Sequence, residues 1–441
     1  MKAPGPRGPR LFQCLRNMQR DYVGTCLALR EQYGDVVFLR QPLKTCFFFR
    51  PDDVEAILDE DGHNICKDVR FKGQADEGVL LSEGKLSRQQ RSLLSRPLSP
   101  QRVHEKFNLI VACTNSLHQL WNDAAGNDEP REIYRDMRNL MLCMSTAVLF
   151  GYDISEKADA YCDALFCSLD DRLKRFMSIV KFPRFLPTPE NRRARKADKY
   201  IASTVKDIIH RSPDLDTNDS VLEILRDATH VQTGEKRNEE QLQQEVTSLL
   251  TAAFLSASSS LSWTLLAIAR HPDIESKLVG ELSSKLSHRK PTVDDVPRLK
   301  YLKMVIEESL RLFPPFPVLK VRRTLKADQI GGYDIPAGCG IVLSPFVTQR
   351  HPDYWTDPEQ FSPNRFEESV SVERRRLAYF PFGGGPRGCI GGHLAMLEMQ
   401  LVIAGLVQRF RFLEVPNQKI GHRAVVTLRP DPGIMMTIEK R

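Results

Sequence analysis

The stretch FGGGPRGCIGG, residues 382–392, is the most informative part of this chain: six glycines surround one proline, one arginine and one cysteine. Glycine has no side chain, so such a backbone can approach a flat object closely. Cys389 comes just before an apolar segment, 393–410, that predicts a helix. A helix N-terminus presents unpaired N–H groups and partial positive charge, which favours a thiolate. The loop holds one cysteine and no histidine, which disfavours zinc, whereas a single thiolate on haem iron fits.

Five residues of the loop keep the spacing F-x-x-G-x-R-x-C-x-G: Phe382, Gly385, Arg387, Cys389 and Gly391. The pattern resembles the haem loop of the cytochrome P-450 family, the haem-thiolate monooxygenases. This resemblance implies that Cys389 is the axial ligand of the haem iron and that the cofactor is haem b. It also implies a mainly α fold with a small β region, in which the haem is buried between a long central helix and the helix after the cysteine.

The composition is that of a globular protein, with 441 residues, 41% hydrophobic and 27% charged. No Gly/Ser-rich linker, low-complexity block or internal repeat is present, so we predict a single domain over 1–441. The net charge of +7 is scattered, which favours a solvated basic surface over nucleic-acid binding.

The ten cysteines form no regular framework, and neither a secretory signal nor an apolar run of about 18 residues is present. We therefore expect a soluble, cytoplasmic monomer without a transmembrane anchor, similar to bacterial members of the family. A peripheral membrane contact stays open.

Hydrophobic periodicity outlines the element order. The runs at 35–40 and 45–50 predict a β-hairpin, and 319–343 predicts short strands with Gly-Gly and Pro-Ala-Gly turns. The segments 88–312 and 393–410 predict a helical core, interrupted by loops that include a charge-rich stretch at 181–196.

One long helix is predicted in the middle of the chain. Asn238 fits an N-cap with Gln241 three residues on, and His-Pro at 271–272 ends the pattern after Arg270. The middle, TAAFLSASSSLSWTLLAIA, is small and apolar on almost all sides. This predicts burial on most faces and a surface against which a bulky group can lie flat.

Other family landmarks occur in order. The segment EESLR carries Glu308 and Arg311 three residues apart, on one face of a helix, where a carboxylate and a guanidinium can bond. The segment FSPNRF, 361–366, resembles the P-E-R-F segment of the family and supplies Arg365. The resemblance implies a buried Glu–Arg–Arg network that supports the haem loop without taking part in the chemistry.

Haem propionates need cations. The segment SRQQRSLLSRPLSP resembles the family helix with W/H-x-x-x-R: Arg91 matches the arginine, but Ser87 stands where tryptophan or histidine is usual. Arg323 matches a second propionate arginine by its spacing of five to Asp328, with Arg322 as a close rival. Arg387 is the third candidate for the same role.

The main departure from the family lies in the long helix, where [AG]-G-x-[DE]-T is usual and this chain has AAFLS, 252–256. Ala253 replaces the glycine that opens a groove for oxygen, Leu255 replaces the acid, and Ser256 keeps a hydroxyl where threonine is usual. Oxygen activation consumes protons delivered through a hydroxyl-and-water relay, so the missing acid removes an entry point for protons.

Three explanations stay open. Ser256 and ordered water suffice, aided by the serines at 258–260; the substrate supplies a carboxylate or hydroxyl; or the enzyme is a peroxygenase, an isomerase or a dehydratase that needs no reductase. No arginine lies at 252–260 to hold a fatty-acid carboxylate, which disfavours the peroxygenase. We expect the serine run to serve helix packing more than proton relay.

The substrate pocket implied by the resemblance is apolar and suits a lipophilic molecule. We expect oxygen insertion, as hydroxylation or epoxidation, into a fatty acid, a terpenoid or a polyketide-like compound of secondary metabolism. Besides a monooxygenase and an enzyme that needs no reductase, a third possible class of protein is a non-enzymatic haem sensor or electron carrier. The candidate lining residues are Val79, Leu80, Leu81, Phe254, Leu255, Phe316, Val318 and Leu319.

Electrons have to come from another protein, because the chain shows no flavin or iron–sulfur pattern. We expect a ferredoxin- or flavodoxin-type partner with its own reductase. The basic run ERRR, 373–376, lies just before the haem loop and is predicted to help dock an acidic partner.

Overall fold

The computed structural model describes residues 2–441 apart from 42, 60–63, 68–77, 81, 127–128, 178–182, 212–219, 229–236, 288, 372–373 and 425, and apart from the side chains of 176, 177, 320 and 321. Everything below concerns the described residues. Leu81, one of the predicted lining residues, and the first residue of the basic run 373–376 lie outside them.

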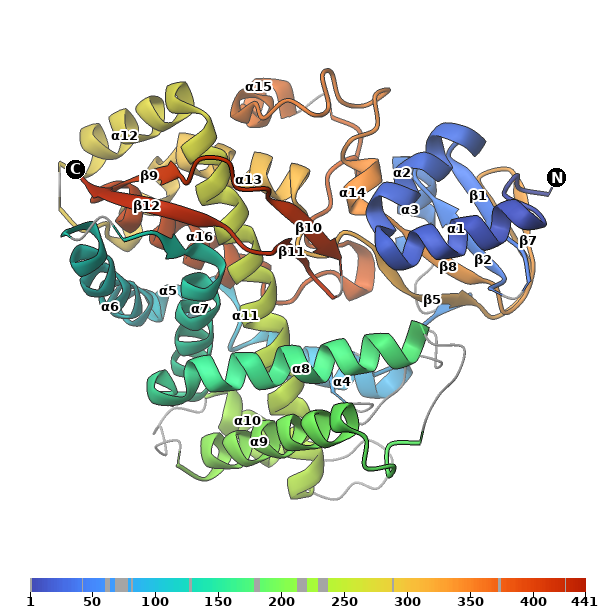
Figure 1. Cartoon of the computed structure of the whole chain (residues 1–441), viewed down its shortest axis with the longest axis horizontal. Coiled ribbons are helices and arrows are strands. Elements are labelled where there is room, and N and C mark those ends of the chain that lie inside the picture. The colour runs from blue at the N-terminus through green and yellow to red at the C-terminus, as the bar shows by residue number, and fades with distance from the viewer. Residues whose placement is uncertain are drawn as a thin grey trace.

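Helices make up most of the molecule (Figure 1). Their bounds are α1 Pro9–Arg20, α2 Tyr22–Tyr33, α3 Pro51–Asp59, α4 Gly84–Ser95, α5 Pro100–Glu105, α6 Phe107–Gly126, α7 Ile133–Phe150, α8 Ala158–Met177, α9 Pro189–Arg211, α10 Val221–Asp227, α11 Glu239–Arg270, α12 Pro272–Leu286, α13 Lys300–Leu312, α14 Pro345–Thr348, α15 Glu368–Ser371 and α16 Gly392–Val407.

The strands are short. Their bounds are β1 Val36–Leu39, β2 Thr45–Phe48, β3 Ile65–Cys66, β4 Arg131–Glu132, β5 Leu319–Thr324, β6 Asp328–Ile330, β7 Tyr333–Ile335, β8 Gly340–Leu343, β9 Phe410–Glu414, β10 Gly421–Ala424, β11 Leu428–Asp431 and β12 Met435–Lys440.

The largest sheet joins the two segments that were predicted to be β-rich, 35–50 and 319–343. Its order is β1-β2-β8-β5-β3, and β2 runs parallel to β8 while the other pairs are antiparallel. It lies on one side of the molecule with α1, α2 and α3 (Figure 1). Gly331 and Gly332, both with positive φ (60° and 79°), form the turn between β6 and β7. The predicted hairpin and the predicted short strands are confirmed.

The long helix α11 runs through the centre of the molecule (Figure 1). It begins with the predicted capping box, in which Asn238 accepts from the Gln241 N–H and Gln241 accepts from the Asn238 N–H. By length and composition α11 could cross a membrane, but 78% of its apolar window is buried inside the protein. That is the behaviour of a core helix in a globular fold.

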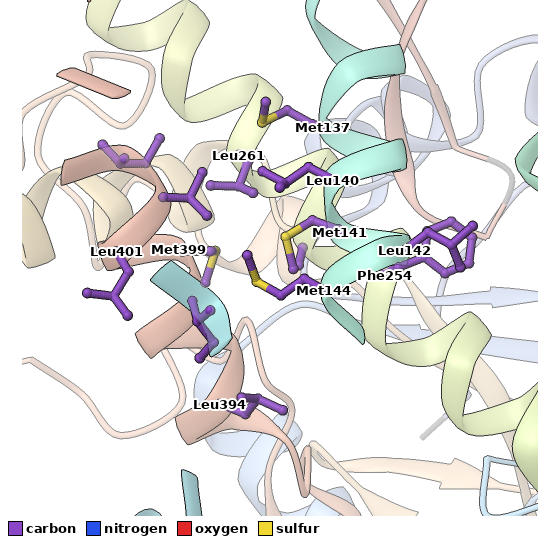
Figure 2. Packing of buried hydrophobic residues seen from close by; sticks show 14 of the residues in the cluster. Met137, Leu140, Met141, Leu142, Met144, Phe254, Leu261, Leu394, Met399 and Leu401 are labelled. Atoms are coloured by element: carbon purple, nitrogen blue, oxygen red, sulfur yellow. The ribbon is translucent and has the colours of Figure 1, made fainter. Parts of the chain in front are cut away.

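The main core lies where α7, α11 and α16 pack together. Figure 2 shows Met141 and Met144 of α7 gathered with Leu261 of α11 and Met399 of α16. Methionine fills irregular gaps well, which suits a core made by three helices that cross at different angles. This core holds α11 rigidly beside the helix that follows the cysteine loop.

Two boundaries differ from the prediction. Helix α16 ends at Val407, and Phe410 begins strand β9, because Phe410 and Phe412 alternate with exposed or half-buried residues and pack edge-on against Trp121 at 6.0 and 5.6 Å. The charge-rich stretch 181–196 is not a loop throughout, since α9 begins at Pro189.

The C-terminal strands were not predicted. β9 and β12 form a sheet with β4, and β10 pairs with β11 in a hairpin. The segment 410–440 is short-stranded and mixed in polarity, so periodicity alone gave no signal there.

Candidate haem-thiolate site

Two glycines of the loop around Cys389 have a backbone conformation that other residues rarely adopt. Gly383 and Gly385 have positive φ (70° and 64°), and a Cβ on Gly385 would lie 2.3 Å from the carbonyl oxygen of Leu58. The Cys389 N–H donates to the carbonyl oxygen of Phe382 at 2.8 Å and closes the turn. Helix α16 then begins at Gly392, so the cysteine precedes its N-terminus as expected.

Cys389 is accessible although its surroundings are largely desolvated. It is exposed, whereas the other nine cysteines, all within the described ranges, are buried or half-buried. Burial nevertheless raises the pKa of its thiol, although a hydrogen bond from the Gly391 backbone and the charge of Arg91 oppose the rise. The thiol is thus accessible while much of the water around it is displaced by protein. Because its pKa is raised, the helix end alone does not produce the thiolate; bonding to a metal would.

Half-buried residues occur on α11 and around the cysteine loop. On α11 they are Thr251, Ala252, Ala253 and Ser256, and the residues between and after them up to Ile268 are buried. Ala253 packs against the main core, as do half-buried apolar residues of the cysteine loop and the first turns of α16. These loop and helix residues are Phe382, Ile390, Ala395 and Met396. Small and apolar residues on α11 and around the cysteine loop fit a flat apolar cofactor such as haem.

The three candidate propionate arginines lie in different settings. Arg91 donates to the Gly388 carbonyl oxygen at 2.5 Å and acts on the Cys389 thiol electrostatically. Arg387 pairs with Glu83, whose carboxylate oxygens accept at 2.5 and 2.6 Å. The Nε of Arg323 is buried and has no hydrogen-bond partner among the described residues. An orphaned buried donor implies a missing acceptor, and a haem propionate would provide one.

The Glu83 carboxylate was not foreseen from the sequence. Burial would raise its pKa, but the ion pair with Arg387 outweighs burial and holds the pKa below its ordinary value. Glu83 also accepts from the Lys67 N–H at 2.5 Å. The only sequence signal for it was its place just before the α4 helix.

Comparison with known proteins settles the family. The family model described as "Cytochrome P450" matches residues 4–437.

The chain belongs to the cytochrome P450 family.

Similar proteins come from plants and bacteria. Cytochrome P450 CYP72A616 of Paris polyphylla is 28% identical over 380 residues, which cover 82% of this chain and 73% of the relative. Cyclooctat-9-en-7-ol 5-monooxygenase of Streptomyces melanosporofaciens is 32% identical over 314 residues, which cover 70% of this chain and 68% of the relative. The crystal structure of the cytochrome P450DA heme domain superposes with a TM-score of 0.88 at 22% identity, covering 100% of this chain and 98% of that one. The chain is thus a P450 monooxygenase with haem as its cofactor and the mainly α fold of the family.

The structure brings the P450 network residues together. Arg311 binds Glu308 through two bonds of 2.7 and 2.8 Å, and both side chains are fully buried. The Nε of Arg365 lies 3.3 Å from the same carboxylate. Arg311 also donates to the carbonyl oxygens of Gln349 and Pro358. A buried pair with all its donors used is well suited to fix a backbone.

Gln349 extends this network to the haem loop and was missed by sequence reasoning. It is fully buried, donates to the carbonyl oxygens of Leu310 and Arg311 at 3.0 and 2.9 Å, and accepts from the Phe380 N–H at 2.9 Å. Since Phe380 lies two residues before Phe382, the amide connects α13 with the start of the loop. A lone glutamine in an irregular segment carries no sequence signal.

The serines of α11 bond along their own helix. Ser256 donates to the Ala252 carbonyl oxygen at 2.9 Å, and Ser258, Ser260 and Ser262 donate to carbonyl oxygens three or four residues earlier. Ser259 instead donates to Leu428 of the β10–β11 hairpin. Packing therefore accounts for the serine run. In the run 256–262, Ser256 is half-buried while the later serines are buried.

The candidate pocket residues do not behave alike. Phe254 and Leu255 are 0% and 1% exposed and belong to the main core. Figure 2 shows Phe254 among the core residues. Val79 is buried in the same core, and Leu80 is 44% exposed. The remaining three, Phe316, Val318 and Leu319, are half-buried; Val318 and Leu319 pack against the smaller cores beside the large sheet.

The basic run before the loop is not a free cationic patch. Arg374 is half-buried, lies over the rings of Trp355 and Phe366 at 4.9 and 4.3 Å, and donates to the Arg365 carbonyl oxygen. Arg375 pairs with Asp52 at 2.6 Å and Arg376 with Glu55 at 2.5 Å. Arg374 is therefore part of the scaffold, and the other two arginines are neutralised locally.

Proposed function

We propose that this P450 inserts one oxygen atom from O2 into a neutral, lipophilic small molecule. The observation that carries the proposal is the open, small-residue face of α11 at Ala252, Ala253 and Ser256, in the same incompletely packed core as the cysteine loop. A relative that acts on cyclooctat-9-en-7-ol supports a neutral substrate. The substrate is expected to be a terpenoid or a similar lipophile, with fatty acids and polyketide-like compounds as the other candidates.

The chain's own residues have distinct roles in this proposal. Haem, when bound, supplies the iron that activates dioxygen. Cys389 would bind its iron, and Arg91, Arg323 and Arg387 would hold its carboxylates. Glu308, Arg311 and Arg365 fix the segment before the loop. Ala253 replaces the glycine that usually opens the oxygen groove and keeps this position of α11 small, and Phe382, Gly385 and Gly391 shape the loop.

Proton delivery is the unusual part of the proposal. Leu255, at the position of the usual acid, is buried in the core and has no titratable group. The Ser256 hydroxyl is held by the Ala252 carbonyl oxygen at 2.9 Å and can pass a proton on from water. The alternative is a peroxygenase, an isomerase or a dehydratase, none of which needs protons delivered to iron-bound oxygen. The leucine at the position of the usual acid is the reason to test this alternative.

The test titrates the ferric holoprotein with neutral terpenoids and macrolides and with fatty acids, and follows the spin shift. Tight binding of neutral molecules, followed by product formation that needs both a ferredoxin system and O2, is the expected result. Turnover with peroxide alone, or without any reductant, would overturn the monooxygenase proposal in favour of the alternative.

A ferredoxin or flavodoxin remains the proposed electron donor to a cytoplasmic, soluble enzyme. Docking through Arg375 and Arg376 would require their exposed pairs with Asp52 and Glu55 to open, which costs little at a surface. Charge reversal at these two arginines should raise the Kd for an acidic ferredoxin severalfold at low salt and not at high salt. An unchanged Kd at low salt would place the docking surface elsewhere.

A further inference from the structure

A buried ion pair lies outside the site just described. Glu245 of α11 and Arg237, which precedes the helix, have side chains that are 2% and 3% exposed, and Arg237 NH1 lies 3.1 Å from Glu245 Oε1. Taking two charges out of water is costly unless they are paired and further hydrogen-bonded. Charged side chains are rarely fully buried without such partners, so this pair calls for a reason.

The carboxylate of Glu245 binds two further segments. Its Oε2 accepts from the backbone N–H of Val79 at 3.0 Å, and its Oε1 accepts from Nε2 of Gln90 on α4 at 2.5 Å. One side chain thus connects α11 with α4, with Arg237 and with the turn at Val79. A carboxylate is suited to this because each oxygen can accept more than one hydrogen bond.

The turn at Val79 is pressed tightly onto α11. A Cβ on Gly78 would lie 2.6 Å from Cβ of Ser248, so only glycine allows this approach. The Ser82 N–H donates to the Gly78 carbonyl oxygen at 3.0 Å, which closes the turn. Val79 itself is buried in the main core.

The other end of the same segment is anchored to the cysteine loop. Glu83 pairs with Arg387, and the Lys67 ammonium donates to the carbonyl oxygens of Leu80 and Ser82 at 2.7 and 2.9 Å. We call residues 78–83, without residue 81, the strap. The strap is held by a carboxylate on α11 at one end and supplies a carboxylate to the cysteine loop at the other.

Helix geometry places the first anchor on the same face of α11 as the half-buried Ala252 and Ser256. Residues three, seven and eleven positions apart share one helix face, so Glu245, Ser248, Ala252 and Ser256 lie on a common stripe of α11. Seven residues of α-helix span roughly 10 Å. The strap therefore packs on the stripe about two turns before the open face at Ala252.

We propose that Glu245 is a positioning residue that fixes the strap on α11 and so sets which molecules fit the substrate cavity. This inference rests on the proposed function, since it assigns specificity to the same site. Glu245 orients Val79 through its N–H and keeps α4, which carries Arg91, at a set distance from α11. Val79 and Leu80 then form a fixed wall of the cavity.

Glu245 is not a substitute for the missing acid. Its carboxylate oxygens lie beside the Arg237 guanidinium and accept from the Gln90 amide and the Val79 N–H. Its role is geometric.

The test compares Glu245→Gln with Glu240→Gln, the same change at an exposed position of the same helix. Two azoles probe the ferric holoprotein: imidazole, which needs little room, and clotrimazole, which needs a shaped cavity. Glu245→Gln leaves fewer acceptors for three donors, so clotrimazole binding should weaken by about tenfold or more, while imidazole binding stays within about twofold. Hydrogen exchange of the peptide with Val79, which needs no haem, should accelerate in Glu245→Gln alone.

Gln90→Leu provides a milder second variant, since it removes the α4 donor and keeps the ion pair. In this variant, clotrimazole binding should again weaken more than imidazole binding, but by a smaller factor than in Glu245→Gln. Equal changes in the binding of both azoles would overturn the proposal, and so would unchanged binding together with unchanged hydrogen exchange at Val79. If Glu245→Gln does not fold, a Gln90→Leu variant that binds clotrimazole and imidazole as the wild type does would overturn it. If the wild-type holoprotein does not show a thiolate spectrum, the proposed function is wrong, and this result would not concern Glu245.

Discussion

The chemistry of this P450 rests on a few side chains whose settings differ sharply. Cys389 is accessible inside the fold, Arg323 has an orphaned Nε, and Arg387 is already neutralised by Glu83. Arg323 is thus the candidate with the clearest need for a haem carboxylate, and Arg387 would share its charge between Glu83 and a propionate.

Replacing Cys389 by serine should remove the thiolate-type band of the reduced CO complex. Serine keeps the size of the side chain but provides no soft thiolate for the iron. Absorption spectra of the reduced, CO-treated protein check this. Cys167→Ser, a half-buried cysteine on α8, serves as the control and should keep the band; a thiolate band in Cys389→Ser would refute the ligand assignment.

Replacing Arg323 by glutamine should speed haem loss to an apomyoglobin scavenger by about tenfold, because a charge-assisted bond to a propionate disappears. Arg322→Gln, the neighbouring change on the same strand, should have a smaller effect. A larger effect at Arg322 would exchange the roles of the two arginines.

Among the elements, α11 combines two functions along its length. Its first turns anchor the strap through Glu245, and its middle offers the open face with Ser256. Beyond that face, Ser259 and Trp263 both donate to the Leu428 carbonyl oxygen and hold the β10–β11 hairpin, and Trp263 stacks on Phe313 with ring centroids 4.4 Å apart. The small residues are needed at the open face, while the rest of the helix is ordinary core.

Ser256→Ala should lower the product formed per reductant consumed by about tenfold and raise peroxide release, because the relay loses its hydroxyl. Substrate affinity from the spin shift should stay nearly constant. Ser258→Ala, which removes a buried hydroxyl that bonds to Leu255, is the matched control and should leave coupling unchanged. Equal coupling in Ser256→Ala and the wild type would mean that water alone, or the substrate, carries the proton.

Across the whole molecule, buried polar groups join distant segments. The network of Glu308, Arg311 and Gln349 connects α13 with the start of the cysteine loop, and the strap connects that loop with α11. Glu398 on α16 is a buried carboxyl group of a different kind. It is 3% exposed, and burial raises its pKa to about 8.

Glu398 should make the protein less stable as the pH rises. Its pKa in the folded state lies above the ordinary value, so the folded state binds the proton more tightly, and this contribution is lost as the pH rises from about 4.5 through about 8. The free energy of unfolding from urea titrations should fall by up to about 4 kcal/mol between pH 5 and pH 8 through this group.

Glu398→Gln should flatten that pH dependence, because an amide does not titrate. Glu439→Gln, at an exposed position on β12, should leave it as in the wild type. The same slope in Glu398→Gln and wild type would show that another group is responsible.

Local patterns were enough to predict much of the molecule. The cysteine loop, the capping box of α11, the hairpin of β1 and β2 and the pairing of Glu308 with Arg311 all depend on residues close together in the chain, where spacing and periodicity carry the information. The single domain over 1–441 stays a prediction.

Other features depend on contacts between distant segments and had no local signal. Glu83 and Arg387 are 304 positions apart, and Val79 and Glu245 are 166 apart. Likewise, the basic run before the loop suggested a docking patch, but Arg374 is enclosed by aromatic rings and its neighbours meet acids of α3. A charge in a sequence shows only that a partner is needed; the fold supplies the partner, because burial and proximity arise when segments far apart in the chain pack together.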